Sequence, residues 1–441
     1  PHSTFINTNE WNQFRRQIEG RFGGIGIQID ISNETGRLLV VAPMVGTPAY
    51  EAGILAGDQI LEIDGQSTDG MSRDKAVETL QGRPGTEVKL TVLHESSDKA
   101  ETIPITRAFI ELPSVLGDRR KPNQHWDFML DKTKKIGYIR ITSFIQNTSA
   151  ELRKALEELK EEGMRGLVLD LRDNPGGLLS AAVEVSDLFL DSGEIVSTKG
   201  RNTPPKSYVA RREGTLDPFP MVVLVNQNSA SASEIVSAAL QDHKRAQIVG
   251  QRSFGKGSVQ NILELEDGNS VLKLTVASYF RPSGENIHRF RNAKQTDKWG
   301  VSPDPGLEVK LKEGEYVRWF LGRRNRDTLM NKGIKKDVSV KASPEKPASP
   351  EKDKEAEDKD QKADKSKDEK KATDAPAKPE TKAEDKDQKA ESKPEEKDKK
   401  AEEKPKASEH GADEPFTDRP LDKALELLRT KLNESALKQA A

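Results

Sequence analysis

The feature that most constrains this chain is a long segment near its C-terminal end that cannot build a hydrophobic core. Between residues 341 and 410, 42 of 70 residues are Lys, Glu or Asp, and none is Val, Ile, Leu, Met, Phe, Trp or Tyr. Such a segment buries too little apolar surface to offset the entropy of ordering it. We therefore expect a disordered insert over residues 335–413. A helix is the alternative, because Ala, Glu and Lys favour helices, although seven prolines interrupt the window.

The rest of the chain has the composition of a folded protein. Outside that window 102 of 371 residues are charged, close to an ordinary globular fraction. A formal net charge of −2 argues against nucleic-acid binding, and no apolar run approaches the roughly 18 residues of a membrane-spanning helix. The absence of cysteine excludes a disulfide, a zinc–thiolate site and a thiol nucleophile. We expect folded domains with no cofactor and no metal, and an activity that resists chelators.

Short strands and glycine turns dominate the first hundred residues. The pattern predicts a helical segment over residues 1–22, followed over residues 23–107 by a sheet with two helices. Thr47-Pro48 opens the first of these helices and Ser72 caps the second, while Asp64-Gly65 forms a tight turn between strands. The predicted unit is of the α+β class.

Three segments of this region resemble a PDZ domain. They are the Gly-Ile-Gly-Ile loop at residues 24–27, the block PAYEAGILAGDQILEIDG and the strand GRPGTEVKLTV. Successive N–H groups in a glycine loop can hold the terminal carboxylate of a peptide, and the adjoining strand edge can accept an added strand. The resemblance implies that Gly24, Ile25, Gly26 and Ile27 bind a substrate C-terminus. The alternative is that these glycines are only turn residues.

Strands alternate with helices over residues 108–334, which predicts an α/β core with helices packed over a mixed sheet. The buried, parallel strands are expected near residues 136–141, 166–172 and 221–225, and the helices near 148–162, 179–190 and 231–241. Beyond the insert, residues 414–441 predict an amphipathic helix that starts at Asp418 or Pro420. Its apolar face should dock on this chain or on another one.

Two segments could carry chemistry. In NQNSASASEI (226–235), a serine follows a buried strand and opens a helix, where backbone amides favour developing negative charge. The alternative is that Ser229 or Ser231 only caps the helix.

In SFGKGSVQ (253–260), Lys256 lies between two glycines. A lysine acts as a general base only when neutral, which requires burial to lower its pKa, and Ser–Lys pairs are an established form of nucleophile and base. A surface loop lysine is the alternative.

The sequence contains two rival candidate sites. Residues 250–256 match the start of a phosphate-binding loop, GxxxxGK, but Gly257 replaces the Ser or Thr that would contact magnesium, and a strand follows. Nucleotide binding is therefore not expected. A Ser-His-Asp triad is open, because triads assemble in space. His243 lies about 18 Å from Ser231 along the predicted helix, which leaves His288 as the other candidate.

The chain is similar to the C-terminal processing (tail-specific) serine peptidases from residue 1 to about residue 311. The segments that carry the resemblance are NSASASEI, GQRSFGKGSVQ, LDLRDNPGGLL, KLTVASYFRPSGENI, GVSPD and, at the end of the chain, PLDKALELL. It implies a serine endopeptidase in which Ser231 is the nucleophile, Lys256 the general base and Gln260 the residue that orients the lysine. The implied oxyanion hole combines the N–H of Ala232 with that of Gly177 or Gly176, with Gly177 favoured.

The resemblance also implies partners and a location. The partners are proteins or peptides with accessible apolar C-termini. The PDZ domain would bind the C-terminus of the substrate and gate the activity. Cleavage, through an acyl-enzyme, would occur further upstream in the substrate. A catalytically silent PDZ scaffold is the alternative, and a homo-oligomer is open. Relatives often act outside the cytoplasm, so the periplasm or cell envelope of a bacterium is expected. The sequence starts at Pro1 and does not show whether an export signal precedes it. The insert departs from the family pattern and is interpreted as a solvated linker or a wall-associated tether.

Overall fold

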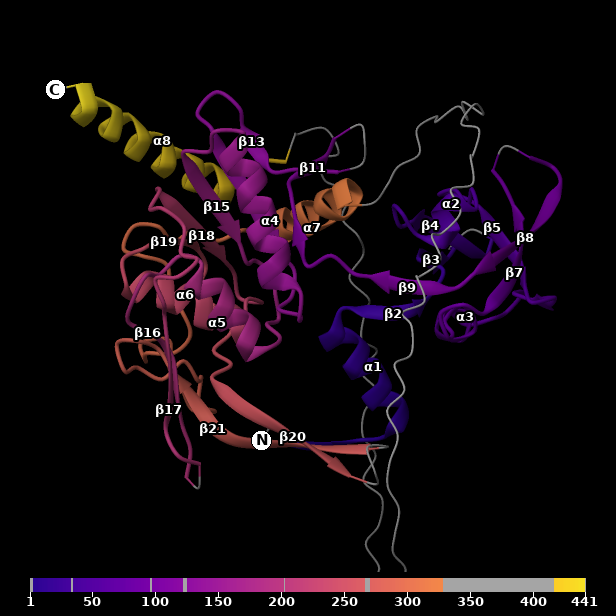
Figure 1. Cartoon of the computed structure of the whole chain (residues 1–441), viewed down its shortest axis with the longest axis horizontal. Coiled ribbons are helices and arrows are strands. Elements are labelled where there is room, and N and C mark those ends of the chain that lie inside the picture. The colour runs from indigo at the N-terminus through magenta and orange to yellow at the C-terminus, as the bar shows by residue number, and fades with distance from the viewer. Residues whose placement is uncertain are drawn as a thin grey trace, which may run out of the picture. The chain divides into compact units, whose positions relative to one another are not determined.

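The computed structural model describes residues 3–32, 35–95, 97–121, 125–201, 203–265, 270–327 and 416–440 (Figure 1). The disordered insert predicted at residues 335–413 therefore lies outside the described residues. The described part contains two six-stranded sheets, one five-stranded sheet and two two-stranded sheets.

The N-terminal sheet is antiparallel, with strand order β3-β4-β5-β7-β8 and β6 paired with β5. Its strands are β3 (Ile27–Ile31), β4 (Leu38–Pro43), β5 (Gln59–Ile63), β6 (Gln66–Ser67), β7 (Glu87–Leu93) and β8 (Ala100–Thr106). Helices α2 (Pro48–Glu51) and α3 (Arg73–Leu80) complete the unit. The predicted cap is confirmed, since the Ser72 hydroxyl accepts the Lys75 N–H at 3.3 Å. So is the turn between β5 and β6, where Asp64 and Gly65 both carry positive φ.

The central sheet contains four parallel strands in the order β14-β15-β18-β19, with β10 and β13 antiparallel to β14. Its strands are β10 (Val115–Leu116), β13 (Met129–Asp131), β14 (Ile136–Ile141), β15 (Gly166–Asp170), β18 (Met221–Val225) and β19 (Gln247–Gly250). Every residue of β14, β15 and β18 is buried, as apolar runs predict for parallel strands covered on both faces. The predicted α/β core is confirmed.

Helices cover both faces of this sheet. Alternate residues such as Leu167, Leu169 and Val223 pack in one cluster with α4 (Thr148–Glu161), α5 (Leu179–Asp187) and α6 (Ala232–Asp242). Their neighbours along the strands pack against Ala424, Leu428 and other apolar residues of α8 (Arg419–Ala440). Figure 1 shows α8 beside β15 and β18, so the helix predicted after the insert docks on its own chain.

The second large sheet is antiparallel, with order β1-β21-β16-β17 and β20 paired with β21. Its strands are β1 (Thr4–Ile6), β16 (Glu194–Lys199), β17 (Lys206–Val209), β20 (Ser258–Leu265) and β21 (Ser270–Phe280). Strand β1 was missed, because residues 1–22 were expected to be helical; only α1 (Thr8–Glu19) is. The remaining elements are the strand pairs β2 (Arg21–Gly24) with β9 (Ala108–Glu111) and β11 (Arg119–Arg120) with β12 (Trp126–Asp127), and helix α7 (Glu313–Asp327).

Candidate active site

Three loops follow the carboxyl ends of adjacent parallel strands and meet at one edge of the central sheet. The glycine loop (residues 173–177) follows β15, the serine loop (residues 226–231) follows β18, and the lysine loop (residues 251–257) follows β19. The strands therefore bring together segments that lie about 25 to 80 residues apart in the sequence.

Ser231 is the N-cap of α6 and is partly exposed. Its backbone has φ 56° and ψ −112°, an unfavourable conformation for a residue other than glycine. The Glu234 N–H donates to the main-chain carbonyl oxygen of Ser231 at 2.9 Å, so this bond does not use the hydroxyl. Ser229 differs: it is buried, donates its hydroxyl to the Leu171 carbonyl oxygen and accepts the Asn226 N–H. Ser229 is therefore a structural residue.

One buried carboxylate joins the serine loop to the lysine loop. Glu234 Oε2 accepts the main-chain N–H of Ser231 at 2.7 Å and that of Lys256 at 2.8 Å. Its Oε1 accepts the Gly255 N–H and the Ser253 hydroxyl, both at 2.6 Å. Burial raises the pKa of Glu234, and these four donors oppose that rise. Sequence reasoning missed Glu234, although Ser231 with Glu three residues later is a capping-box pattern that signals such a contact.

The glycines beside Lys256 are required by close packing. A Cβ atom on Gly255 would lie 2.6 Å from Cβ of Arg289, and one on Gly257 would lie 2.4 Å from the nitrogen of His288. Lys256 itself is partly buried. It lies near a second lysine, Lys273, whose pKa is lowered first by burial and then by the charge of Lys256.

The remaining predicted candidates are Gln260 and the two histidines His243 and His288. Gln260 lies on β20, four residues after Lys256, where a bulge interrupts the pairing with β21. His243 caps the far end of α6 and its Nε2 contacts the Glu194 carbonyl oxygen at 2.7 Å. His288 adjoins the lysine loop through its main chain, next to Gly257.

The glycine loop lies directly against the serine loop. The Asn174 carbonyl oxygen accepts the Ala230 N–H at 3.0 Å and the Ser233 hydroxyl at 2.9 Å. A Cβ atom on Gly176 would lie 2.8 Å from Cβ of Ser231 and 2.9 Å from the nitrogen of Ala232. A side chain at this position would therefore collide with the start of α6.

The two glycines of this loop differ in their N–H groups. The Gly176 N–H donates to Asn174 Oδ1 at 2.8 Å. Gly177 has φ 147° and forms an isolated parallel bridge with Phe144. In that bridge the Gly176 carbonyl oxygen accepts the Phe144 N–H, and the Leu178 N–H donates to the Phe144 carbonyl oxygen. The Gly177 N–H therefore takes no part in the bridge.

Buried charges support the base of the glycine loop. The Arg172 guanidinium donates five hydrogen bonds at 2.7–3.1 Å, three to the two carboxylate oxygens of Asp170 and two to those of Asp418. Arg172 thus forms ion pairs with Asp170 and with Asp418, which the sequence placed only at a helix start. Burial alone would raise the pKa of Asp170, but Arg172 and the Tyr138 hydroxyl hold it below its usual value.

The candidate peptide-binding loop lies at the edge of the N-terminal sheet. Ile25 is buried, and its carbonyl oxygen accepts the Ala49 N–H at 2.9 Å. Gly26 has φ 79°, and a Cβ atom there would lie 2.4 Å from Cβ of Thr47. Strand β3, which starts at Ile27, pairs with β4 on one side and is the edge strand of its sheet.

Neither a metal cluster nor a spanning helix emerges from the described ranges. No group of three or more His, Asp or Glu side chains there is arranged to hold a metal ion. None of the helices in those ranges combines the length and the apolar character needed to cross a membrane.

Comparison with known proteins identifies the family. The family model described as peptidase family S41 matches residues 135–305, and a PDZ-domain model matches residues 39–93. The chain is 40% identical over 318 residues to a carboxy-terminal-processing protease of Bartonella bacilliformis, covering 71% of this chain and 68% of that protein. It is 38% identical over 313 residues to a carboxyl-terminal-processing protease of Synechocystis, covering 70% and 68%.

A third relative is the carboxy-terminal processing protease CtpA of Bacillus subtilis, which is 37% identical over 325 residues, covering 72% of this chain and 62% of that protein. Each of the three alignments spans about 70% of this chain. The chain therefore belongs to the carboxyl-terminal processing proteases, serine proteases of peptidase family S41 that carry a PDZ domain.

Proposed function

We propose that Ser231 and Lys256 form a Ser–Lys dyad that cleaves protein tails through an acyl-enzyme. The observation that supports this dyad is the Glu234 carboxylate, which binds the main-chain N–H groups of both residues and so fixes the two loops at one point. The position of Ser231 at the start of α6 adds amide dipoles that favour developing negative charge.

The proposed reaction has two stages. Neutral Lys256 takes the proton of the Ser231 hydroxyl, whose oxygen attacks the scissile carbonyl carbon. The C–N bond breaks, the lysine returns the proton to the leaving amine, and an ester to Ser231 remains. Water, deprotonated by Lys256, then hydrolyses the ester and restores both residues. Because the base must be neutral, turnover should rise with pH; a flat profile from mildly acid to alkaline pH would argue against a lysine base.

We propose the N–H groups of Ala232 and Gly177 as the oxyanion hole. Ala232 is the first residue of α6, so its N–H has no partner within the helix. The Gly177 N–H is left out of the bridge with Phe144, whereas the Gly176 N–H is engaged by Asn174. These observations favour Gly177 over Gly176.

Gln260 is proposed to orient Lys256 from β20, as the resemblance implies. Its position four residues after the lysine, at a bulge that redirects the strand, supports this role. Gln260→Ala should lower turnover less than Lys256→Ala does, because the base itself remains. Equal losses would make Gln260 part of the proton-transfer group, and an unchanged rate would remove it from the site.

We propose that residues 24–27 and the edge of β3 bind apolar substrate C-termini. The support is the family membership, together with an edge strand that can accept an added strand beside a glycine loop. A peptide with a free carboxyl end should be cleaved faster than the same peptide amidated. Substitution at Ile27 to Lys should slow peptide turnover while Ser231 still reacts with a small electrophile. Equal rates for the two peptides would contradict the proposal.

The decisive test compares wild type with Ser231→Ala and Lys256→Ala on an unstructured protein with an apolar C-terminus. The proposal expects cleavage by wild type only, and labelling of wild type by a fluorophosphonate at Ser231. If wild type and both variants leave the substrate intact, the result would favour the alternative function, a catalytically silent scaffold. If Ser231→Ala still cleaves, a different nucleophile is at work.

We also propose that the protein works outside the cytoplasm, in the periplasm or cell envelope of a bacterium. The support is its membership of a family whose three relatives named above are bacterial. Fractionation of the source cells with an antibody to this chain tests the location, and recovery in the cytoplasmic fraction would contradict it.

A further inference from the structure

We propose that Tyr316 of α7 is a positioning residue for catalysis, which acts through Asp173 to hold the glycine loop against the serine loop. The inference rests on the proposed Ser231 chemistry, but its physical basis is a separate hydrogen-bond network behind the site. That network joins three elements that no sequence motif connects: the glycine loop, the serine loop and α7.

Asp173 is the centre of the network. Its Oδ1 accepts one amide hydrogen bond from Asn226 and one from Asn228, both at 2.8 Å. Its own N–H donates to Asn226 Oδ1 at 3.0 Å, so Asp173 and Asn226 bind each other in both directions. The Tyr316 hydroxyl donates to Asp173 Oδ2 at 3.1 Å and accepts from Asn228 Nδ2 at 3.2 Å. Tyr316 thus contacts both loops with a single oxygen atom.

The backbone of Asp173 needs this support. Asp173 has φ 57°, in the left-handed region that costs energy for a residue other than glycine. It directly precedes Asn174, whose carbonyl oxygen accepts the Ala230 N–H and the Ser233 hydroxyl. A shift at Asp173 would therefore pass to Asn174 and from there to residues on either side of Ser231.

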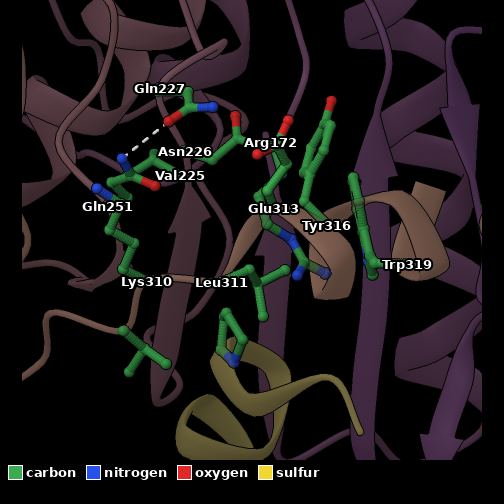
Figure 2. Close-up of a pocket in the computed structure, with 12 residues that line it drawn as sticks. Arg172, Val225, Asn226, Gln227, Gln251, Lys310, Leu311, Glu313, Tyr316 and Trp319 are labelled. Atoms are coloured by element: carbon green, nitrogen blue, oxygen red, sulfur yellow. Dashed lines mark hydrogen bonds between the residues drawn. The ribbon is translucent and has the colours of Figure 1, made fainter. Parts of the chain in front are cut away.

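The ring of Tyr316 is itself fixed in place. It packs against Trp319 with ring centres 5.8 Å apart and against Phe320 at 6.4 Å. Trp319 is buried and lies under the Arg172 guanidinium at 4.6 Å. Figure 2 shows Tyr316 and Trp319 along one side of a cavity of about 440 Å³, with Gln227 and Gln251 along the other. The hydroxyl is therefore presented to the loops by a packed aromatic group.

The protonation states suit the contact. Burial raises the pKa of Tyr316, and the charge of Asp173 adds to that rise, so the hydroxyl remains a donor at neutral pH. An ionised carboxylate is the matching acceptor, since such charge-assisted bonds are stronger than neutral ones. Asp173 is partly exposed, so water can satisfy its oxygens if Tyr316 is lost. Loss of the hydroxyl should then loosen the loops without unfolding the protein.

The test removes only the hydroxyl, by Tyr316→Phe in the full-length chain. We expect kcat per active site, titrated with a fluorophosphonate, to fall about tenfold, because small misplacements of reacting groups have effects of this order or larger. KM for the same peptide and the melting temperature should stay close to wild type. The matched control is Tyr208→Phe on β17, which removes a hydroxyl from a residue outside the three loops and should leave kcat unchanged.

A double-mutant cycle separates positioning from general structural damage. Asp173→Asn should also lower kcat, and Tyr316→Phe added to it should cost little more, because both act through one contact. Losses that multiply would overturn the proposal, as would an unchanged kcat per titrated site in Tyr316→Phe. A lower melting temperature with an unchanged kcat would assign Tyr316 a merely structural role. Failure of the proposed function is distinguishable, because it would appear as cleavage by Ser231→Ala.

Discussion

Replacement of Glu234 by Gln tests whether one buried carboxylate builds the catalytic centre. Each of its oxygens accepts two hydrogen bonds, Oε1 from Ser253 and Gly255 and Oε2 from Ser231 and Lys256. Glutamine keeps the size of the side chain but has one oxygen and one NH₂ group. In either orientation of the amide, two of the four donors therefore face another donor.

The magnitude follows from those two lost acceptors. A buried donor without a partner costs about 1–3 kcal/mol, so two cost about 2–6 kcal/mol. Part of this is recovered because glutamine removes a carboxylate whose burial raises its pKa. We expect the free energy of unfolding to fall by about 2–4 kcal/mol. Turnover should fall further, about 100-fold or more, because the main chains of Ser231 and Lys256 lose a shared anchor.

Thermal unfolding and peptide turnover are measured together on purified Glu234→Gln, wild type and a control. The control is Glu184→Gln, which makes the same chemical change at an exposed carboxylate that accepts the Ser149 hydroxyl. The control should match wild type in both assays. Our reasoning is refuted if Glu234→Gln keeps turnover within twofold of wild type, because the carboxylate would then not organise the two loops.

Three further predictions concern the glycine loop and its support. Gly177→Ala should abolish most turnover, because its Cβ would lie 2.0 Å from the Phe144 carbonyl oxygen; wild-type rates would contradict this. Asp418→Asn should destabilise the protein by about 3 kcal/mol by breaking a buried pair with Arg172, which chemical denaturation would measure. The pKa of Asp170 is depressed, so its contribution to stability is complete above its unfolded value near 4 and is lost as pH falls through the lower folded value. The melting temperature should therefore drop below about pH 4, and less steeply in Asp170→Asn.

Several parts of this protein follow from local sequence patterns. The buried strands β14, β15 and β18 were predicted from apolar runs, and the Asp64-Gly65 turn from its residue types. These features depend on neighbours within a few residues, so the sequence contains the information that forms them. Strand β1 was missed because its pairing partner, Lys273 in β21 for Thr4, lies far along the chain.

The candidate site likewise combines features that are visible in the sequence with features that depend on the fold. Small residues around a serine at a helix start and a lysine between two glycines indicated the two candidate segments, because these features lie within single stretches of sequence. The roles of Ser231 and Lys256 were implied by the family resemblance. The preference for Gly177 over Gly176 came only from resemblance. The structure adds a physical argument, because the side chain of Asn174 engages one of the two N–H groups.

The sequence by itself indicated the N-terminal sheet with its two helices, the buried parallel strands of the central sheet and the residue types of the loops at the candidate site. Only the tertiary structure decided that Glu234 links the serine loop to the lysine loop. It also decided that Asp418, which follows the insert in the sequence, binds Arg172, and that Tyr316 contacts Asp173. The physical reason is that a hydrogen bond depends on atoms that meet in space. The tertiary fold brings such atoms together from positions separated by 22 to 246 residues, a separation over which sequence periodicity carries no signal.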